Sequence, residues 1–240
     1  SSEAAPTKKR SPQTGIALGS GSVFEEAETA FAHIAGMIDR QEEVGRQLQD
    51  PGLEGRAMAR LLEEFDAIGR AVESSGYFRR AERISEVLRG LGFEEKNFGK
   101  RTPELSGGWQ MRLALAKILL GDPDVMLLDE PTNYLDLEAR NWLEGFLRTY
   151  RGGVLLVSHD RYFLDVTVNE VYELFNGKLT RYPGTFSAYE ERRARELAAI
   201  FELWERQQEE IQKLEDFIRR FRYKATKAAQ VQSCLLYTSR

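Results

Sequence analysis

Two adjacent carboxylates, Asp129 and Glu130, follow the short apolar run 125–128 and precede Pro131. An unbroken apolar run of this length predicts a strand that is buried on both faces, and open α/β sheets bind ligands at the carboxyl ends of their strands. At that edge Asp129 can bind Mg²⁺, which prefers hard oxygen ligands, and Glu130 can orient or deprotonate an attacking water. The alternative for the pair taken alone is that it only caps the turn before Pro131.

A second stretch, LSGGWQ, places Ser106, Gly107 and Gly108 directly before the helical pattern MRLALAKILL. The first N–H groups of a helix lack partners and the helix dipole is positive there, so this arrangement predicts a bound anion such as a phosphate. The obvious source would be a nucleotide held by a P-loop, G-x-x-x-x-G-K-[ST], in the same chain. The sequence contains no such motif, because the nearest candidate, at 19–22, has no lysine after it and no apolar strand before it.

Two further polar side chains are candidates of lower specificity. His159 follows the apolar run 154–157, where a histidine can contact a γ-phosphate and link the state of a nucleotide to the sheet. Gln13 lies in a Ser- and Pro-containing stretch, and its side-chain carbonyl can join the ligands of a metal ion. The alternative for His159 is a structural role in capping a turn.

The elements that would position these groups follow from the apolar patterns. The runs 125–128 and 154–157 predict strands separated by a helix near 137–150, and a strand–helix–strand connection implies a parallel α/β sheet. The two apolar runs should therefore end at the same edge. The segments VYELF and KLTRY, joined by Asn176 and Gly177, predict a β-hairpin.

The rest of the chain is helical in pattern. Apolar residues recur every three or four positions over 24–48 and again over 61–72, and Asp-Pro-Gly at 50–52 separates the two runs. We expect an αα-hairpin, with two ordinary helices packed on the core as the alternative. A further helix is predicted near 78–91. A long charged helix is predicted from 186 to about 231, with a stripe of apolar residues close to the 3.5-residue period of a coiled coil. The stripe consists of Leu197, Ile200, Trp204, Ile211, Leu214, Ile218 and Phe221.

Composition limits the class of protein. The 240 residues carry a net charge of -4, with 42% hydrophobic and 30% charged residues, which is typical of a soluble protein with long charged helices. The single cysteine, Cys234, excludes an internal disulfide framework and fits a reducing, cytoplasmic location. No apolar run approaches the ~20 residues that span a bilayer, so no membrane partner is expected.

Taken together, a loop glutamine, LSGGWQ, LLDEPTNYLD and VSHDR occur in an order and spacing that resemble the ATP-binding cassette (ABC) ATPases. The resemblance implies bound ATP and Mg²⁺. By this resemblance Gln13 is the Q-loop residue and a metal ligand, and the signature motif that binds nucleotide includes Ser106, Gly107, Gly108 and Gln110. Asp129 is the Walker B metal ligand and Glu130 the catalytic base. Asp136 belongs to the D-loop, which binds nucleotide, and His159 is the catalytic switch histidine.

The resemblance also answers whose phosphate the signature motif would hold. In this family the signature of one cassette closes over ATP held by the P-loop of a second cassette, which makes a second cassette the expected partner. The missing P-loop is expected upstream of Ser1, so that the chain begins part-way through its domain. The implied fold is a partial α/β ABC-type nucleotide-binding domain over 1–185, with a parallel sheet core, a helical arm hairpin at about 24–72 and a signature helical subdomain at about 76–122.

Three segments, DEPTNYLDLEARNWLEGFL, SHDRYFLD and YPGTFSAYEERRARE, resemble the ABC-F branch, which consists of tandem cassettes without membrane domains. That branch has a helical arm before the signature and a charged linker helix after the first cassette, expected here over 186–233, which reaches toward ribosome-bound tRNA. The resemblance therefore implies a translation factor that acts on the ribosome. The segment CLLYTSR at 234–240 departs from the pattern and is expected to be non-native, so Cys234 receives no function.

The end of the predicted linker has the chemistry of an RNA-binding surface. A run of basic residues with no acid between them is typical of RNA contacts, and Phe221 and Tyr223 lie within the run, where they can stack on bases. The basic residues are Arg219, Arg220, Arg222, Lys224 and Lys227. The alternative is a solvated helix face that pairs with upstream acids such as Glu215.

Two other functions share parts of this pattern. The ATPase subunit of a membrane ABC transporter would have the same motifs but would need neither the arm nor a long basic helix. A non-catalytic interaction module would fit a chain without a P-loop. Flanking sequence would discriminate the three, because only the ABC-F hypothesis requires both an upstream P-loop and a second cassette downstream.

Overall fold

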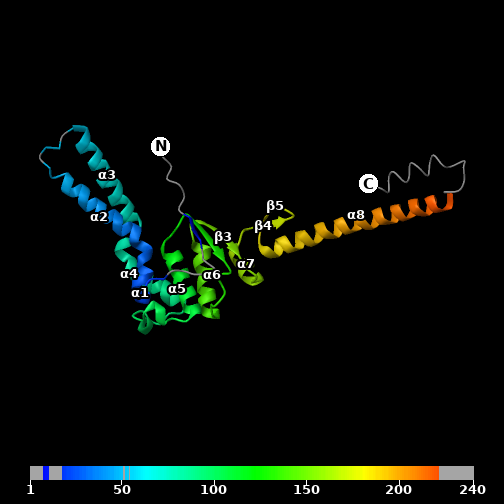
Figure 1. Cartoon of the computed structure of the whole chain (residues 1–240), viewed down its shortest axis with the longest axis horizontal. Helices are drawn as coiled ribbons and strands as arrows, with labels where there is room; N and C mark the ends of the chain where they lie inside the picture. The colour runs from blue at the N-terminus through cyan, green and yellow to red at the C-terminus, as the bar shows by residue number, and fades with distance from the viewer. Residues whose placement is uncertain (1–7, 11–17, 51, 54, 222–240) are drawn as a thin grey trace. The chain divides into compact units, whose positions relative to one another are not determined.

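The computed structural model describes residues 8–10, 18–50, 52–53 and 55–221. The chain divides into two compact units, Ser1–Thr167 and Val168–Arg240. Figure 1 shows both units and labels helices α1–α8 and strands β3–β5. The first unit contains the sheet, the signature segment and a helical hairpin, and the second contains a β-hairpin and the long helix.

A three-stranded parallel sheet forms the centre of the first unit. Its strands β1 (Lys8–Arg10), β2 (Val125–Asp129) and β3 (Gly153–Val157) lie in the order β1-β2-β3. In the register of β2 and β3, Val125 faces Gly153 and Asp129 faces Val157. The predicted parallel α/β sheet is therefore confirmed. Strand β1 was not predicted because Lys-Lys-Arg carries no apolar pattern.

The two apolar strands differ in burial. Met126 and Leu128 of β2 are buried, whereas Val154, Leu155 and Val157 of β3 are exposed. The unbroken apolar run 154–157 predicts a second strand buried on both faces, as 125–128 does, and this expectation is wrong for β3. Among the described strands only β2 pairs with β3, so β3 is an edge strand, and apolar content in the sequence does not determine whether another element covers it.

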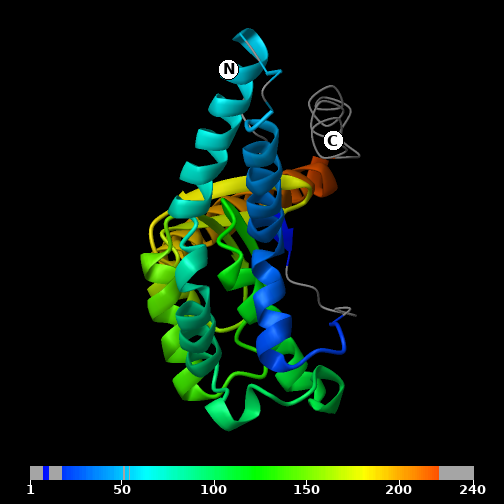
Figure 2. The ribbon, with the colours of Figure 1, turned by 90° about the vertical axis from the view of Figure 1, so that its left-hand side faces the viewer.

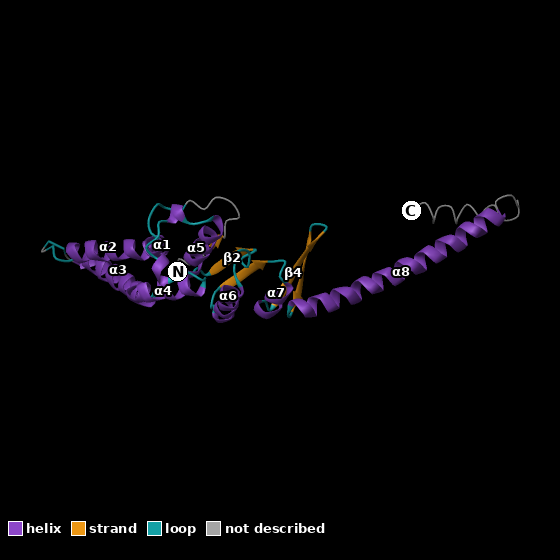
Figure 3. Ribbon diagram, turned by 90° about the horizontal axis from the view of Figure 1, so that it is seen from below, coloured by secondary structure: helices purple, strands orange, loops and turns teal. Residues whose placement is uncertain are grey.

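Helices α5 (Gly107–Leu120) and α6 (Leu137–Thr149) lie next to β2 (Figure 3). Helices α4 (Arg80–Gly90) and α7 (Arg161–Thr167) complete this part of the unit, together with short 3₁₀ turns at Tyr77–Arg79, Glu95–Asn97 and Thr102–Glu104. Their apolar faces share one core. Its members include Ile84, Leu88, Leu113, Leu119, Met126, Leu128, Leu143 and Phe163.

A glycine fixes the contact between α4 and α6. A Cβ placed on Gly90 would lie 2.1 Å from the indole ring of Trp142, so the two helices approach at a distance that only glycine permits. The Trp142 ring lies 5.5 Å from the ring of Phe146, centroid to centroid. No local pattern indicates this contact, because 52 residues separate Gly90 from Trp142.

Helix α1 (Val23–Glu28) begins at a capping box, in which Ser22 Oγ accepts from the Glu25 N–H and Glu25 Oε2 accepts from the Ser22 N–H. Its buried Glu26 accepts from the N–H of Gly19 at 2.9 Å and pairs with Lys117 of α5. This pairing compensates the cost of a buried carboxylate. Helix α1 thereby belongs to the core.

The predicted αα-hairpin is present. After a 3₁₀ turn at Thr29–Phe31, α2 (Ala32–Gln47) and α3 (Gly55–Ser74) run side by side and project from the rest of the unit (Figure 2). Arg40 Nε and Glu64 Oε1, 2.8 Å apart, pair the two helices. The projecting part begins near Ala32 and not at residue 24, because Val23, Ala27 and Phe31 are buried in the core.

The second unit confirms the predicted β-hairpin and long helix. Strands β4 (Glu170–Phe175) and β5 (Lys178–Pro183) are antiparallel and joined by Asn176 and Gly177, whose φ values of 47° and 74° are those of a type I′ turn. Helix α8 extends over Phe186–Phe221. The rest of the predicted linker, including 222–233, and the segment 234–240 lie outside the described residues.

Candidate functional site

Glu130 directly follows β2, and the backbone turns at this residue. Its φ of 49° lies in the left-handed region, which a non-glycine residue rarely adopts and which costs about 1–3 kcal/mol at such positions. Two hydrogen bonds hold this conformation: the Glu130 N–H donates to Val157 O at 2.8 Å, and the Asn133 N–H donates to Glu130 O at 3.1 Å. Backbone strain of this kind concentrates at functional sites.

The Glu130 carboxylate faces the loop that follows β3. Its Oε2 accepts from the His159 N–H at 3.3 Å, and its Oε1 lies 3.5 Å from His159 Nε2. The Glu130 side chain is 15% exposed and that of His159 is 98% exposed. Within the described residues, the buried Oε1 of Glu130 accepts no hydrogen bond. An acceptor in this state fits a water molecule or ligand group as donor.

Asp129 is the half-buried last residue of β2 and lies opposite Val157 in the register. In the described part of the chain, no group of three or more His, Cys, Asp or Glu residues could hold a metal ion. One carboxylate ligand such as Asp129 suits Mg²⁺, which keeps several waters and takes its remaining ligands from phosphate oxygens. Gln13, the other predicted metal ligand, lies outside the described residues.

Ser106 is the N-cap of α5, with φ -64° and ψ 159°, and its side chain makes no capping hydrogen bond. The first backbone bond of the helix is from the Gln110 N–H to Ser106 O at 3.0 Å. A Cβ on Gly107 would meet no atom within 4 Å, and one on Gly108 would meet the side chain of Tyr134 at 3.5 Å. The start of α5 is therefore open, and the chain itself does not require glycine at 107.

Gln110 and Asp136, both predicted to contact nucleotide, have partners within the chain. Gln110 Nε2 donates to Leu105 O at 3.1 Å. Asp136 is the N-cap of α6, where its Oδ1 accepts from the Ala139 N–H at 2.9 Å. That hydrogen bond is the main cause that lowers the pKa of Asp136, and a weaker contribution in the same direction comes from Arg112. Both side chains thus stabilise the segments that carry the predicted site.

The sequence analysis did not identify two arginines, Arg112 and Arg140, that contact the segments of the candidate site. Arg112 of α5 donates to Tyr134 O at 2.7 Å and to Asp136 Oδ2 at 2.9 Å. Arg140 of α6 pairs with Asp160, which follows His159 and caps α7 by accepting from the Phe163 N–H. A usable signal for Arg112 was its position in the pattern MRLALAKILL, which is apolar apart from Arg112 and Lys117.

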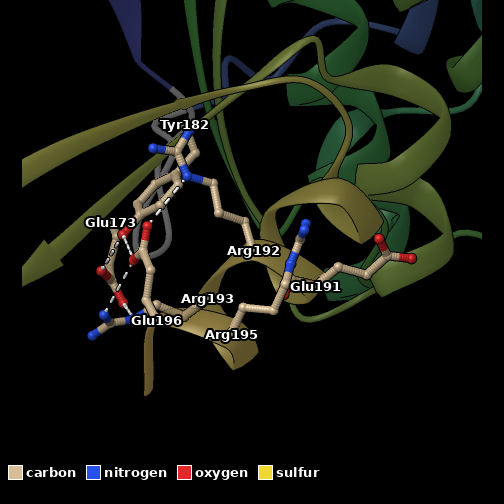
Figure 4. A network of polar contacts seen from close by, with 7 residues as sticks. All are labelled: Glu173, Tyr182, Glu191, Arg192, Arg193, Arg195 and Glu196. Carbon is tan, nitrogen blue, oxygen red and sulfur yellow. Dashed lines mark hydrogen bonds and ion pairs between the residues drawn. The ribbon is translucent and has the colours of Figure 1, made fainter. Parts of the chain in front are cut away.

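In the second unit, a polar network attaches the start of α8 to the β-hairpin (Figure 4). Arg193 Nε lies 2.8 Å from Glu173 Oε1, and Tyr182 Oη donates to Glu196 Oε2 at 2.9 Å. The bond between Tyr182 and Glu196 raises the pKa of Tyr182 and lowers the pKa of Glu196. These contacts hold the first turns of α8 on the hairpin.

Beyond this network most of α8 is exposed, but Ile211, Leu214 and Ile218 are half-buried. Leu197, Ile200 and Trp204, members of the predicted coiled-coil stripe, are all exposed. At the end of the helix, Arg219 pairs with Asp216 and Arg220 is exposed. The other predicted RNA-binding residues, Arg222, Lys224 and Lys227, lie outside the described residues.

Across the described ranges, no helix is both long enough and apolar enough to cross a membrane. A sequence profile of the family described as "ABC transporter" matches residues 8–133, which include LSGGWQ, Asp129 and Glu130. The chain belongs to the ATP-binding cassette family. A second profile with the same description matches residues 172–235 of the cassette chain, which include most of the β-hairpin and α8.

Several curated relatives align with most of the cassette chain. "Putative ATP-binding protein YdiF" of Bacillus subtilis is 39% identical over 184 residues, which are 77% of this chain and 28% of that protein. "Probable ATP-binding protein YheS" of Escherichia coli K12 is 42% identical, over 75% of this chain and 27% of that protein. Human "ATP-binding cassette sub-family F member 3" is 39% identical, over 83% of this chain and 28% of that protein.

These relatives confirm the predicted resemblance to the F branch of the family. The cassette chain spans less than a third of the length of each of them. Among solved structures, "Structure of ATP binding subunit of ABC transporter" matches with a TM-score of 0.50 and 16% identity, over 73% of this chain and 58% of that one. That similarity confirms the predicted fold.

Proposed function

We propose that this chain is part of an ABC-F ATPase that binds and hydrolyses ATP between two cassettes. The observation that carries the proposal is Glu130 Oε1, which is buried at the carboxyl edge of the sheet, accepts no hydrogen bond within the described residues and lies 3.5 Å from His159 Nε2. In the proposed mechanism Glu130 orients and deprotonates the attacking water, and His159 contacts the γ-phosphate. Asp129 would hold Mg²⁺, which neutralises charge on the phosphates when bound.

The start of α5 would complete the site of the second cassette. The Ser106 hydroxyl makes no capping hydrogen bond, and a Cβ on Gly107 would meet no atom within 4 Å. The hydroxyl and the first N–H groups of α5 can therefore bind a phosphate of the ATP that the second cassette holds. Gln110 and Asp136 would support this surface through the backbone bonds described above. The chain thus contributes the signature side of one site and the Walker B side of another.

The proposal predicts that ATP binding needs more than this chain. The 240-residue chain should show no micromolar ATP affinity by calorimetry, because a P-loop normally supplies most phosphate contacts and none is present in this sequence. A protein that contains this chain, a P-loop and a second cassette should release phosphate from ATP when Mg²⁺ is present. Micromolar binding by the chain alone, or no hydrolysis by the two-cassette protein, would contradict the proposal.

We also propose that α8 and the basic residues that follow it contact the ribosome and its tRNA, in the cytoplasm. This proposal is supported by the length of α8, which has 36 residues. Contacts such as that between Arg193 and Glu173 attach its start to the β-hairpin, and its other end bears exposed charges. At 3.6 residues per turn the basic side chains would surround the helix, which suits folded RNA with phosphates on several sides. These side chains are Arg219, Arg220, Arg222, Lys224 and Lys227.

Reversing Arg219, Arg222 and Lys224 to Glu in the two-cassette protein should weaken ribosome association. The difference from the unchanged protein should shrink as salt rises, because phosphate contacts are screened. Co-sedimentation at two salt concentrations measures both effects. The matched control reverses three exposed basic residues of the first unit, Arg79, Arg89 and Lys96, each of which pairs with a nearby acid. Equal binding by the triple variant at low salt would leave this stretch a solvated helix face.

A further inference from the structure

Arg112 connects three segments that are far apart in the sequence. From α5 its Nε donates to Tyr134 O at 2.7 Å, and its Nη1 donates to Leu91 O at 3.1 Å and to Asp136 Oδ2 at 2.9 Å. The side chain is 10% exposed, and its guanidinium carbon lies 4.6 Å from the ring centroid of Trp109. The planar guanidinium can serve these acceptors together, which a lysine ammonium cannot do in the same geometry.

The backbone beside Arg112 is shaped for this contact. Gly92 has a φ of 89°, and a Cβ at this position would lie 2.6 Å from Arg112 Nη1. A larger residue at 92 would therefore displace the guanidinium and strain the backbone. The positive charge of Arg112 is compensated by Asp136, which forms an ion pair with it and also caps α6.

The acceptor carbonyl of Tyr134 belongs to a strained and exposed residue. Tyr134 has a φ of 68°, and its ring and Cβ lie about 3.5 Å from the position that a Cβ of Gly108 would occupy. A tyrosine keeps a backbone conformation in the left-handed region only where surrounding contacts stabilise it. The bond from Arg112 Nε supplies such a restraint, and it does so next to the open start of α5.

We propose that Arg112 is a positioning residue that holds residues 134–136 against the signature segment, so that the two form one fixed surface toward a second cassette. The proposal rests on the proposed function only for the identity of the partner. Arg112 itself would not touch the nucleotide. It would act through Tyr134 and Asp136, and its loss would leave the start of α5 intact but free the neighbouring segment to move.

The first test uses the 240-residue chain and needs no ATP. In Arg112→Met, hydrogen exchange at the backbone amides of 133–137 should rise at least severalfold, while exchange in the β2 core should stay unchanged. Arg112→Lys should give an intermediate rise, because one carbonyl bond can form again, and it also serves if the Met variant fails to fold. The matched control is Arg83→Met, which removes an arginine of α4 that pairs with Asp122 at 3.5 Å.

The second test uses the two-cassette protein. Arg112→Met should lower kcat for ATP hydrolysis about 10- to 100-fold, since a misplacement of about 1 Å can cost 10²-fold in rate. The ATP affinity before closure should stay close to that of Arg83→Met. If the unchanged protein has no ATPase activity, the proposed function fails while the exchange result still decides the role of Arg112. Unchanged exchange at 133–137, or unchanged kcat in an active protein, would overturn the inference.

Discussion

Replacing Glu130 by glutamine in the two-cassette protein is expected to lower the rate of ATP hydrolysis about 10²–10⁴-fold, the usual contribution of a general base. Glutamine keeps the size of the side chain and can still accept from the His159 N–H, which lies 3.3 Å from Glu130 Oε2. It carries no negative charge and cannot take a proton from water. ATP binding should therefore survive while turnover collapses, so that the ATP-bound closed state accumulates.

The measurement combines phosphate release with retention of labelled ATP. Glu86→Gln is the matched control, because Glu86 is an exposed residue of α4 and the change in charge is the same. Glu130→Asp adds a test of geometry, since the shortened side chain keeps the charge but withdraws the carboxylate from His159. A Glu130→Gln protein that hydrolyses ATP at the rate of the control would show that another group is the base.

The second large effect concerns stability. Gly90→Ala should destabilise the first unit by about 1–3 kcal/mol, the usual cost of overpacking, because the new methyl group would lie 2.1 Å from the Trp142 ring. That ring is held from another side by Phe146, so it cannot move away freely. A fall in the urea midpoint or melting temperature of the chain measures the effect.

Gly145→Ala in α6 is the matched control. A Cβ at 145 would meet nothing within 4 Å, so the same substitution should stabilise the chain by about 0.5–1 kcal/mol through helix propensity alone. Opposite signs for the two variants would show that close approach, and not propensity, decides the result at Gly90. A Gly90→Ala chain that melts no lower than the unchanged chain would rule out the tight α4–α6 contact.

Local patterns in the sequence were sufficient for several elements. The apolar run 125–128 followed by Asp129 and Glu130 predicted β2 and the carboxylates at its carboxyl end, and both are present. Asn176 and Gly177 predicted the turn of the β-hairpin, whose positive φ values suit these residue types. Such features can be predicted because the interactions that produce them join residues close together in the chain.

The expectations that failed or were missing depended on distant contacts. The sequence of β3 is as apolar as that of β2, yet Leu155 is exposed because no described element covers it. The segment Lys8–Arg10 forms a strand only because β2 offers it an edge. In both cases the pattern of apolar residues predicts which secondary structure a segment can form, and contacts with neighbouring segments decide whether it pairs and is buried.

The same distinction applies to the candidate site. The sequence alone identified Glu130, His159 and the signature residues as chemically capable groups and gave their order. Only the tertiary structure placed His159 beside Glu130, turned the Glu130 backbone into the left-handed region and brought Arg112 to Tyr134. Those contacts join residues 22 to 29 positions apart, and their geometry depends on how α5, β2 and β3 pack, which no local pattern encodes.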